Sequence, residues 1–103
     1  MIVQRLTVKA KQGRTQELAD LVSSEVVAQR KRGTVPHPCR ICTPNIGQPR
    51  DVVMVEWEWP DLATYSDYWP EWSQLPTTPE YWRKWDELAE PDWTNEIWSL
   101  RTP

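Results

Sequence analysis

Tyrosine and tryptophan side chains are the groups in this chain with the clearest capacity for binding chemistry. The 103 residues include eight tryptophans and no phenylalanine, and all eight tryptophans lie between Trp57 and Trp98. Each such ring buries about 150–250 Å² and brings a polar N–H or O–H group with it. Two short helices over a small sheet need fewer rings than this, so the surplus predicts a pocket. The predicted ligand-binding set is Trp57, Tyr65, Tyr68, Trp69, Trp72, Trp82 and Trp85.

The same rings have a simpler interpretation, because aromatic residues at helical spacing often fill a core or a subunit interface. Both interpretations remain open at this stage. If the pocket exists, its lining predicts a small apolar or aromatic ligand. Tyr65 and Tyr68 would then be available to hydrogen-bond a polar end of that ligand.

His37, Cys39 and Cys42 form a His-x-Cys-x-x-Cys segment, whose residue types bind zinc or form redox pairs. A structural zinc site needs four ligands, and the chain has no other histidine or cysteine. If the segment is a strand, its two thiols point to opposite faces of a sheet. We therefore expect no metal site and no cofactor. A dimer that pools His37 and Cys39 from two chains is the alternative.

Catalytic signatures are weak. His37 is the only histidine, so any histidine base must be this residue, and Tyr65 is the other weak catalytic candidate. No Ser-His-Asp order, glycine-rich phosphate loop or metal-binding carboxylate motif occurs. Whether the protein is an enzyme is therefore left open.

Glu56 and Glu58 alternate along one predicted strand and share a face of it. A buried carboxylate pair can perform acid–base chemistry. Alternating glutamates more often mark a wetter face or an interface, and there Arg5 or Arg40 would neutralise them. We expect the interface or surface role.

Charge and hydropathy exclude several partners. The net charge is −3, with +5 on residues 1–51 and −8 on residues 52–103, so the chain lacks the basic balance of a nucleic-acid-binding protein. No apolar run approaches the roughly 20 residues of a membrane span. The opening MIVQRLTV lacks the charged-then-apolar order of a signal peptide. We expect a cytoplasmic protein with no nucleic-acid or membrane partner.

The first half of the chain predicts a strand, a helix and two further strands. Ile2–Ala10 alternates and is rich in β-branched residues, and Thr15–Arg32 has helical spacing and ends before Gly33. Pro36–Thr43 is a shorter strand candidate. Asp51–Trp59 is the clearest strand, with Val53, Val55, Trp57 and Trp59 on one face and Val52, Met54, Glu56 and Glu58 on the other.

The second half predicts two helices and a strand. Asp61 is the expected N-cap of the first helix, which should end or kink at Trp69 because Pro70 follows. A capping box from Thr77 to Glu80 should start the second helix, and Pro91 should close that segment. Asn95–Arg101 is the last, short strand.

This order predicts a single α+β domain over residues 1–103, a ferredoxin-like βαββαβ sandwich with a four-stranded antiparallel sheet. Helices cover one face of such a sheet. Large apolar groups on both faces of Asp51–Trp59 predict that a second subunit covers the other face. The expected partner is therefore a second copy of the chain, in a homodimer.

Local features extend this expectation to a known group of proteins. They are the Gly13–Arg14 helix start, the VVMVEWEW strand at 52–59, the interrupted aromatic helical region and the closing EIWSL at 96–100. With these, the chain resembles the dimeric α+β barrel superfamily, which includes antibiotic-biosynthesis monooxygenases and NIPSNAP-like proteins. The resemblance implies facing sheets in a homodimer and a ligand pocket between the sheet and helices of each subunit. Superfamily members that bind or degrade haem usually offer a histidine from the second helical region, where this chain has none.

Three functional hypotheses follow. The first is a binding protein for a small apolar or aromatic molecule. The second is a cofactor-independent monooxygenase or isomerase in which Tyr65, Trp69 or His37 positions the substrate. The third is a structural or regulatory dimer whose tryptophans only fill the core.

Overall fold

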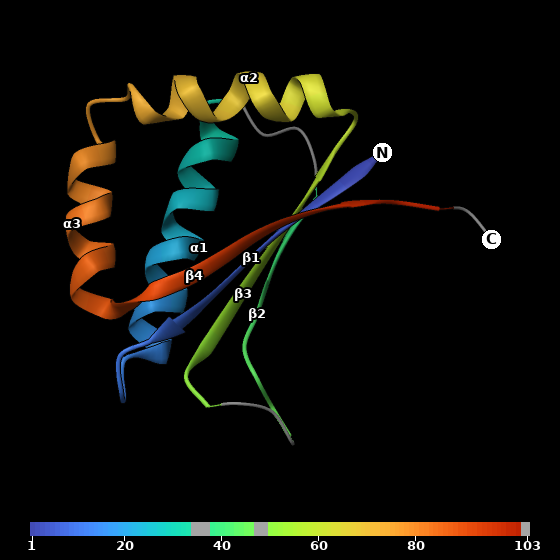
Figure 1. Ribbon diagram of the computed structural model, residues 1–103. Helices are drawn as coiled ribbons and strands as arrows, with labels where there is room; N and C mark the ends of the chain where they lie inside the picture. The colour runs from blue at the N-terminus through green and yellow to red at the C-terminus, as the bar shows by residue number, and fades with distance from the viewer. Residues whose placement is uncertain (34–37, 47–49, 102–103) are drawn as a thin grey trace.

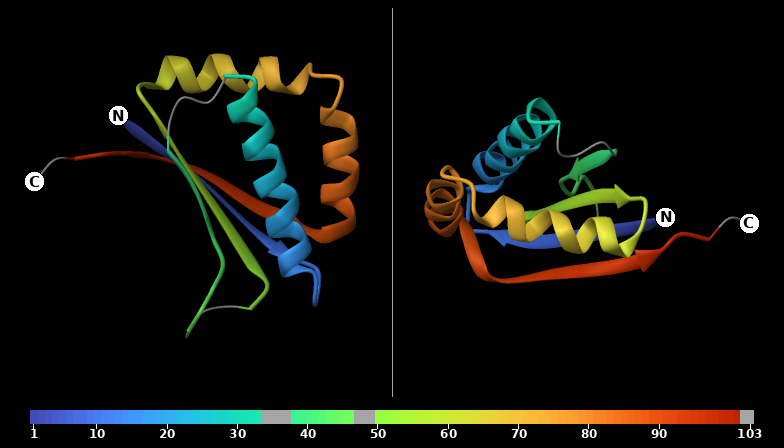
Figure 2. Two further views of the ribbon diagram at one scale, coloured as in Figure 1. Left: turned by 180° about the vertical axis from the view of Figure 1, so that it is seen from behind. Right: turned by 90° about the horizontal axis from the view of Figure 1, so that it is seen from above.

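The computed structural model describes residues 1–33, 38–46 and 50–101, and it contains four strands and three helices within them. The sheet order is β2-β3-β1-β4, and every neighbouring pair is antiparallel, as in the predicted ferredoxin-like α+β fold. Helix α1 runs along the sheet, and α2 lies across the ends of α1 and α3 (Figures 1 and 2). The elements are β1 Ile2–Ala10, α1 Thr15–Lys31, β2 Cys39–Cys42, β3 Val52–Trp59, α2 Leu62–Ser73, α3 Thr78–Leu88 and β4 Ala89–Ser99.

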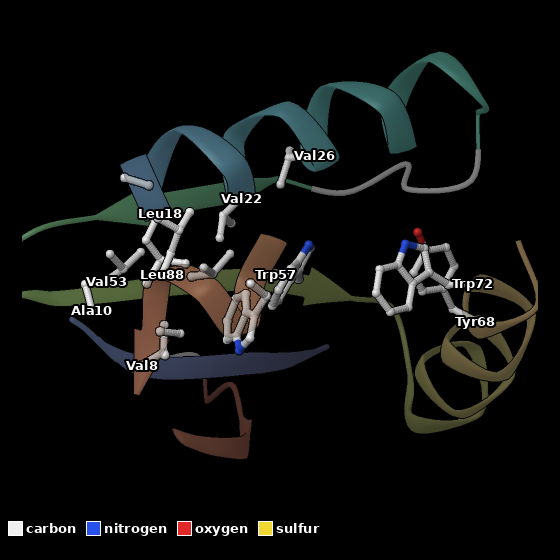
Figure 3. Close-up of a cluster of buried hydrophobic side chains, with 14 of the residues drawn as sticks. Val8, Ala10, Leu18, Val22, Val26, Val53, Trp57, Tyr68, Trp72 and Leu88 are labelled. Atoms are coloured by element: carbon white, nitrogen blue, oxygen red, sulfur yellow. The ribbon is translucent and has the colours of Figure 1, made fainter. Parts of the chain in front are cut away.

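The core lies between the helices and one face of the sheet. Alternate residues of β3 are buried on this face, as the sequence pattern predicts, and include Val53 and Val55 at 0 % exposure. Leu18, Val22 and Val26 of α1 follow helical spacing and are buried against them (Figure 3). The opposite face of the sheet carries no helix within the described part of the chain (Figure 2).

The described helices are all too short or too polar to cross a membrane.

Helix α2 continues through Pro70 to Ser73, so a helix end at Trp69, one of the two predicted effects of Pro70, is wrong. Proline at this position removes the hydrogen bond to the carbonyl of Ser66. Ser66 and Pro70 are both exposed, so water can reach that carbonyl. The Ser73 hydroxyl donates a 2.8 Å hydrogen bond to the Pro70 carbonyl in the last turn.

The last strand is longer than predicted, because β4 begins at Ala89 and includes Pro91. Its pairing with β1 shifts register, so that Ala89 pairs with Ala10 while Trp93 pairs with Val8. The extra residues of β4 form a bulge at the sheet edge. Proline is tolerated at edge strands and bulges because no ladder hydrogen bond is required of it there.

The capping box predicted at Thr77–Glu80 does not form. Thr77 has helical dihedral angles (φ −85°, ψ −14°) and its side chain makes no capping hydrogen bond. Glu80 instead binds Arg83 one turn later. Helix α3 nevertheless starts at the predicted place, with Pro79 in its first turn. The predicted cap of α2 is confirmed, since the Asp61 carboxylate accepts a 2.7 Å hydrogen bond from the Thr64 backbone N–H.

Candidate ligand-binding site

A cavity of about 330 Å³ lies between the helix-covered face of the sheet and the three helices. Aromatic rings make most of its wall, together with aliphatic side chains from β1, β3 and α1. The volume falls at the lower end of the range typical of small-molecule sites. The lining residues are Gln4, Leu6, Val22, Glu25, Val26, Gln29, Val55, Trp57, Tyr65, Trp69, Trp72, Ser73, Tyr81, Trp82, Trp85, Trp93 and Asn95.

The structure brings six of the seven predicted ligand-binding residues to this wall: Trp57, Tyr65, Trp69, Trp72, Trp82 and Trp85. The seventh, Tyr68, is buried at the α2 end of the core and does not line the cavity (Figure 3). Its ring packs against Trp59, with centroids 5.2 Å apart, and against Trp69 at 4.7 Å.

The rings of the wall contact one another in a nearly continuous series. Trp69 lies edge-on to Trp57 at a centroid distance of 5.3 Å and to Trp72 at 5.6 Å. Trp82 is 5.6 Å from both Trp72 and Trp85. Edge-to-face pairs of this kind stabilise aromatic clusters by about 0.5–1.5 kcal/mol each beyond their buried area. The cavity therefore has a wall of mutually supported rings.

A chain of hydrogen bonds crosses one end of the cavity. The buried Gln4 oxygen Oε1 accepts from the indole N–H groups of Trp59 and Trp69, both at 3.1 Å. The Gln4 amide nitrogen donates to Asn95 Oδ1 at 2.9 Å. The Asn95 amide nitrogen then donates to the Tyr65 hydroxyl oxygen at 3.1 Å. This chain, here called the Gln4 relay, connects β1, β3, α2 and β4.

Glu25 of α1 supplies the charged part of the wall. Its carboxylate accepts a 2.6 Å hydrogen bond from the Trp72 indole and forms a 2.9 Å ion pair with Arg32. Burial raises the pKa of the Tyr81 hydroxyl well above its usual range, and the negative charge of Glu25 raises it further. Tyr81 therefore remains a neutral phenol at physiological pH. Among the described residues that line the cavity, Glu25 alone carries a charge.

The indole N–H of Trp57 has no hydrogen-bond partner within the described part of the chain, although it is buried. An unpaired buried donor costs stability, by about 1–3 kcal/mol. Trp57 is 5 % exposed and packs edge-on against Trp69. Its burial is thus favoured by ring packing and not by polar pairing.

On the uncovered face of the sheet, charges alternate along one row of paired residues, here called the charge row. Arg40, Glu56, Arg5 and Glu96 are neighbours across β2, β3, β1 and β4. Glu56 is paired with both arginines, at 2.8 Å to Arg5 and 3.2 Å to Arg40, so the predicted neutralisation of this glutamate is confirmed. The Arg5 guanidinium also lies 5.6 Å from the centre of the half-exposed Trp98 ring.

The two cysteines lie on opposite faces of β2, as predicted for a strand. Cys39 pairs with Trp57 on the helix side, whereas Cys42 pairs with Met54 on the uncovered side. Burial raises the pKa of the Cys39 thiol to about 11, and the nearby positive charge of Arg30 offsets part of that effect.

Within the described residues no cluster of histidine, cysteine or carboxylate groups could hold a metal ion. His37, the weak catalytic candidate, lies outside the described residues.

Sequence reasoning did not select Gln4, Glu25, Tyr81, Trp93 and Asn95 as site residues. Gln4 had a usable signal, because it interrupts the otherwise apolar positions of β1 that face the helices. Tyr81 falls on the same helix face as Trp85, which is a weaker signal. The others reach the cavity only through the tertiary arrangement of α1 and β4.

The fold places this protein among small α+β proteins with a four-stranded antiparallel sheet covered on one side by helices. A NIPSNAP family protein from Agrobacterium tumefaciens has a similar structure, with a TM-score of 0.79 and 21% identity over 98% of this chain and 92% of that one. An uncharacterized NIPSNAP-like domain protein from Burkholderia xenovorans matches with a TM-score of 0.81 and 20% identity, over 98% and 85% of the two chains. A candidate antibiotic biosynthesis monooxygenase from Deinococcus radiodurans matches with a TM-score of 0.66 and 14% identity, over 100% and 95%.

No family model matches the sequence, and no curated protein matches it either. At these identities the similarity to solved structures establishes a shared fold. The predicted resemblance to the superfamily of NIPSNAP-like proteins and monooxygenases is confirmed at that level.

Proposed function

We propose that this protein binds a small apolar or aromatic molecule in the cavity between its sheet and its helices. The observation that carries the proposal is the cavity itself, about 330 Å³ in volume and walled mainly by indole and phenol rings. Close-packed protein interiors leave few voids larger than a water molecule, so a space of this size favours an occupant over a purely structural role of the rings. Concave, mostly apolar pockets with a few polar groups are typical of ligand sites.

The test compares binding of 1-ethylnaphthalene to the wild-type protein and to a variant with an obstructed cavity. Ser73 lines the cavity and is exposed, so Ser73→Phe should block the space without disturbing the core. Ser66 is exposed on the same helix but does not line the cavity, so Ser66→Phe is the matched control. We expect equilibrium dialysis to show saturable binding by wild type and Ser66→Phe, and weaker binding by Ser73→Phe. Equal binding by all three proteins would overturn the proposal.

Native mass spectrometry of protein purified without denaturation addresses the natural ligand. An extra mass that is absent from Ser73→Phe would support the proposal and allow the ligand to be identified. The competing hypothesis of a cofactor-independent monooxygenase or isomerase requires that the recovered molecule be turned over. Unchanged ligand after incubation in air would leave binding alone as the function.

We also propose that a second copy of the chain packs against the face of the sheet that carries no helix. The charge row carries alternating signs in the order Arg40, Glu56, Arg5, Glu96. A twofold axis parallel to the strands would place Arg40 opposite Glu96 of the second copy and Glu56 opposite its Arg5. Every facing pair in this arrangement has opposite charges, so the surface is complementary to itself.

Sedimentation velocity tests this assembly. We expect the wild-type protein to sediment as a dimer and Met54→Lys, on the same face of β3, to sediment as a monomer with unchanged circular dichroism. Lys84→Met, on the exposed surface of α3, changes the net charge by one unit in the opposite direction and should remain a dimer. A monomeric wild-type protein would overturn the proposed assembly, and the third hypothesis of a structural dimer with it.

A further inference from the structure

Building on the proposed function, we propose that the ligand carries a neutral oxygen acceptor, such as a ketone oxygen, and that the Tyr65 hydroxyl donates a hydrogen bond to it. The proposal rests on the direction in which donors and acceptors are ordered along the Gln4 relay. It specifies the class of ligand within the apolar or aromatic molecules considered above.

The orientation of the Gln4 amide is fixed by its two indole neighbours. An indole N–H can only donate, so the Gln4 atom that faces both Trp59 and Trp69 must be the oxygen. The amide nitrogen of Gln4 is therefore the atom that faces Asn95. This assignment follows from the donor-only chemistry of indole and needs no choice between two equivalent amide flips.

The same reasoning passes along the relay to Tyr65. Since Asn95 accepts from Gln4 through its oxygen, its nitrogen faces Tyr65 and donates to the hydroxyl oxygen. One lone pair of the hydroxyl is thereby occupied, and the hydroxyl proton must point away from Asn95. Among the residues that the structure describes, the Tyr65 hydroxyl accepts this hydrogen bond and donates none. Tyr65 and Asn95 both line the cavity, so an oxygen of a bound molecule can receive it.

The rest of the wall restricts the charge of this acceptor. Glu25 is the charged residue of the lining, and its partner Arg32 does not line the cavity. A carboxylate ligand would face a negative charge across an apolar space, with no cation among the described lining residues to balance it. A neutral ketone or a similar oxygen can accept from the Tyr65 hydroxyl, and the rest of such a ligand can pack against the aromatic rings of the cavity wall. Tyr65 is on this basis a positioning residue for the ligand.

The test uses two probes of nearly equal shape, 1-acetonaphthone and 1-ethylnaphthalene, which differ in the ketone oxygen. The measured quantity is the ratio of their dissociation constants for each protein. In Tyr65→Phe we expect the preference for the ketone to fall about fivefold relative to wild type, as for loss of one neutral hydrogen bond. Binding of 1-ethylnaphthalene should change little, because the ring remains. Tyr68→Phe removes a hydroxyl that does not line the cavity, and its ratio should match wild type.

Asn95→Asp tests the direction of the relay while leaving the Tyr65 hydroxyl in place. An aspartate can accept from Gln4 with one oxygen and from Tyr65 with the other, which would turn the hydroxyl proton away from the cavity. Asn95 is exposed, so the added charge is tolerated there. We expect this variant to lose the ketone preference as Tyr65→Phe does.

The outcomes separate the two proposals. A wild-type protein that binds neither probe overturns the proposed function. Binding of both probes with the same ratio in wild type and Tyr65→Phe overturns the inference about Tyr65 and leaves the cavity as a binding site. An unaltered ratio in Asn95→Asp overturns the relay argument, and 1-naphthoate binding tighter than 1-acetonaphthone overturns the preference for a neutral ligand.

Discussion

Arg5 and Glu56 lie directly opposite each other on β1 and β3, and two arginine nitrogens donate to the same carboxylate oxygen at 2.9 and 2.8 Å. The other carboxylate oxygen accepts from Arg40 at 3.2 Å. The Glu56 side chain is only 11 % exposed, whereas that of Arg5 is 37 % exposed. Glu56 is thus an anion held inside the sheet surface by two cations from neighbouring strands.

We expect Glu56→Ala to lower the free energy of unfolding by about 1–2 kcal/mol, because it removes charge-assisted hydrogen bonds and leaves the arginines of the two flanking strands without their carboxylate. Urea unfolding followed by circular dichroism measures this. Glu80→Ala removes a fully exposed glutamate bound to Arg83, and its unfolding midpoint should not move measurably. Equal midpoints for the two variants would show that the charge row does not stabilise the sheet.

Gln4→Leu should destabilise the protein by about 2–4 kcal/mol. The substitution keeps a side chain of similar size but leaves the indole N–H groups of Trp59 and Trp69 without their acceptor. Gln12→Leu, at an exposed position of the loop after β1, provides the control for the change in side-chain chemistry. Similar unfolding free energies for Gln4→Leu and the wild type would mean that the relay has no structural role.

Trp85→Ala should cost about 3–5 kcal/mol, since the ring is 4 % exposed and supports the cavity wall from α3. Leu62→Ala, at a side chain that is 57 % exposed, should change stability by less than about 0.5 kcal/mol. Thermal and urea unfolding of both variants give the comparison. A loss below about 1 kcal/mol in Trp85→Ala would contradict its position in the core.

Pro70→Ala should stabilise the protein by about 1–2 kcal/mol. Alanine restores the backbone hydrogen bond that proline lacks inside α2, although the unfolded chain also gains freedom. Pro79→Ala is the matched control, because proline in the first turn of α3 sacrifices no helix hydrogen bond. If Pro70→Ala were less stable than the wild type, Pro70 would have a packing role that outweighs the backbone term.

The Cys39 thiol should react slowly with iodoacetamide in the folded protein. With its pKa raised to about 11 by burial, only roughly 0.1% of the thiol is ionised at pH 8. In a Cys42→Ala variant, the alkylation rate of Cys39 should rise about tenfold per pH unit between pH 7 and 9. A rate that reaches a plateau below pH 9 would contradict the raised pKa of Cys39. As a control, both cysteines of the wild-type protein should react quickly once it is unfolded in urea.

The sheet was predictable from the chain because its signals are local. The alternation of Val53, Val55, Trp57 and Trp59 requires one buried face whatever the rest of the fold does. Asp61 caps α2 through atoms only three residues away. Such features depend on short-range chemistry, so the sequence pattern and the structure agree there.

The predicted helix end at Trp69 and the predicted start of the last strand at Asn95 were wrong for the opposite reason. Whether Pro70 ends a helix depends on whether the freed carbonyl of Ser66 meets water, which the arrangement of α2 on the molecule decides. Pro91 is tolerated because β4 is an edge strand with a bulge, and strand order is a tertiary property.

The same limit applies to the candidate site. Helical spacing brings Tyr65, Trp69 and Trp72 to one side of α2, and all three reach the cavity. Tyr68 lies on the adjoining side of the helix, toward Trp59. Which of these rings faces the cavity depends on the rotation of α2 about its axis, and no local sequence pattern predicts that rotation. Asn95 similarly enters the relay only because β4 pairs with β1.

The edge-to-face series of tryptophans also has an optical consequence. The centres of neighbouring indoles are 5.3–5.6 Å apart in the series Trp57–Trp69–Trp72–Trp82–Trp85. The intense far-ultraviolet transitions of indoles at such separations couple, so we expect an exciton contribution of the whole series to the far-ultraviolet circular dichroism of this protein. Rotation of a single ring would redistribute intensity across the entire band, so this spectrum records the geometry of the wall as a unit.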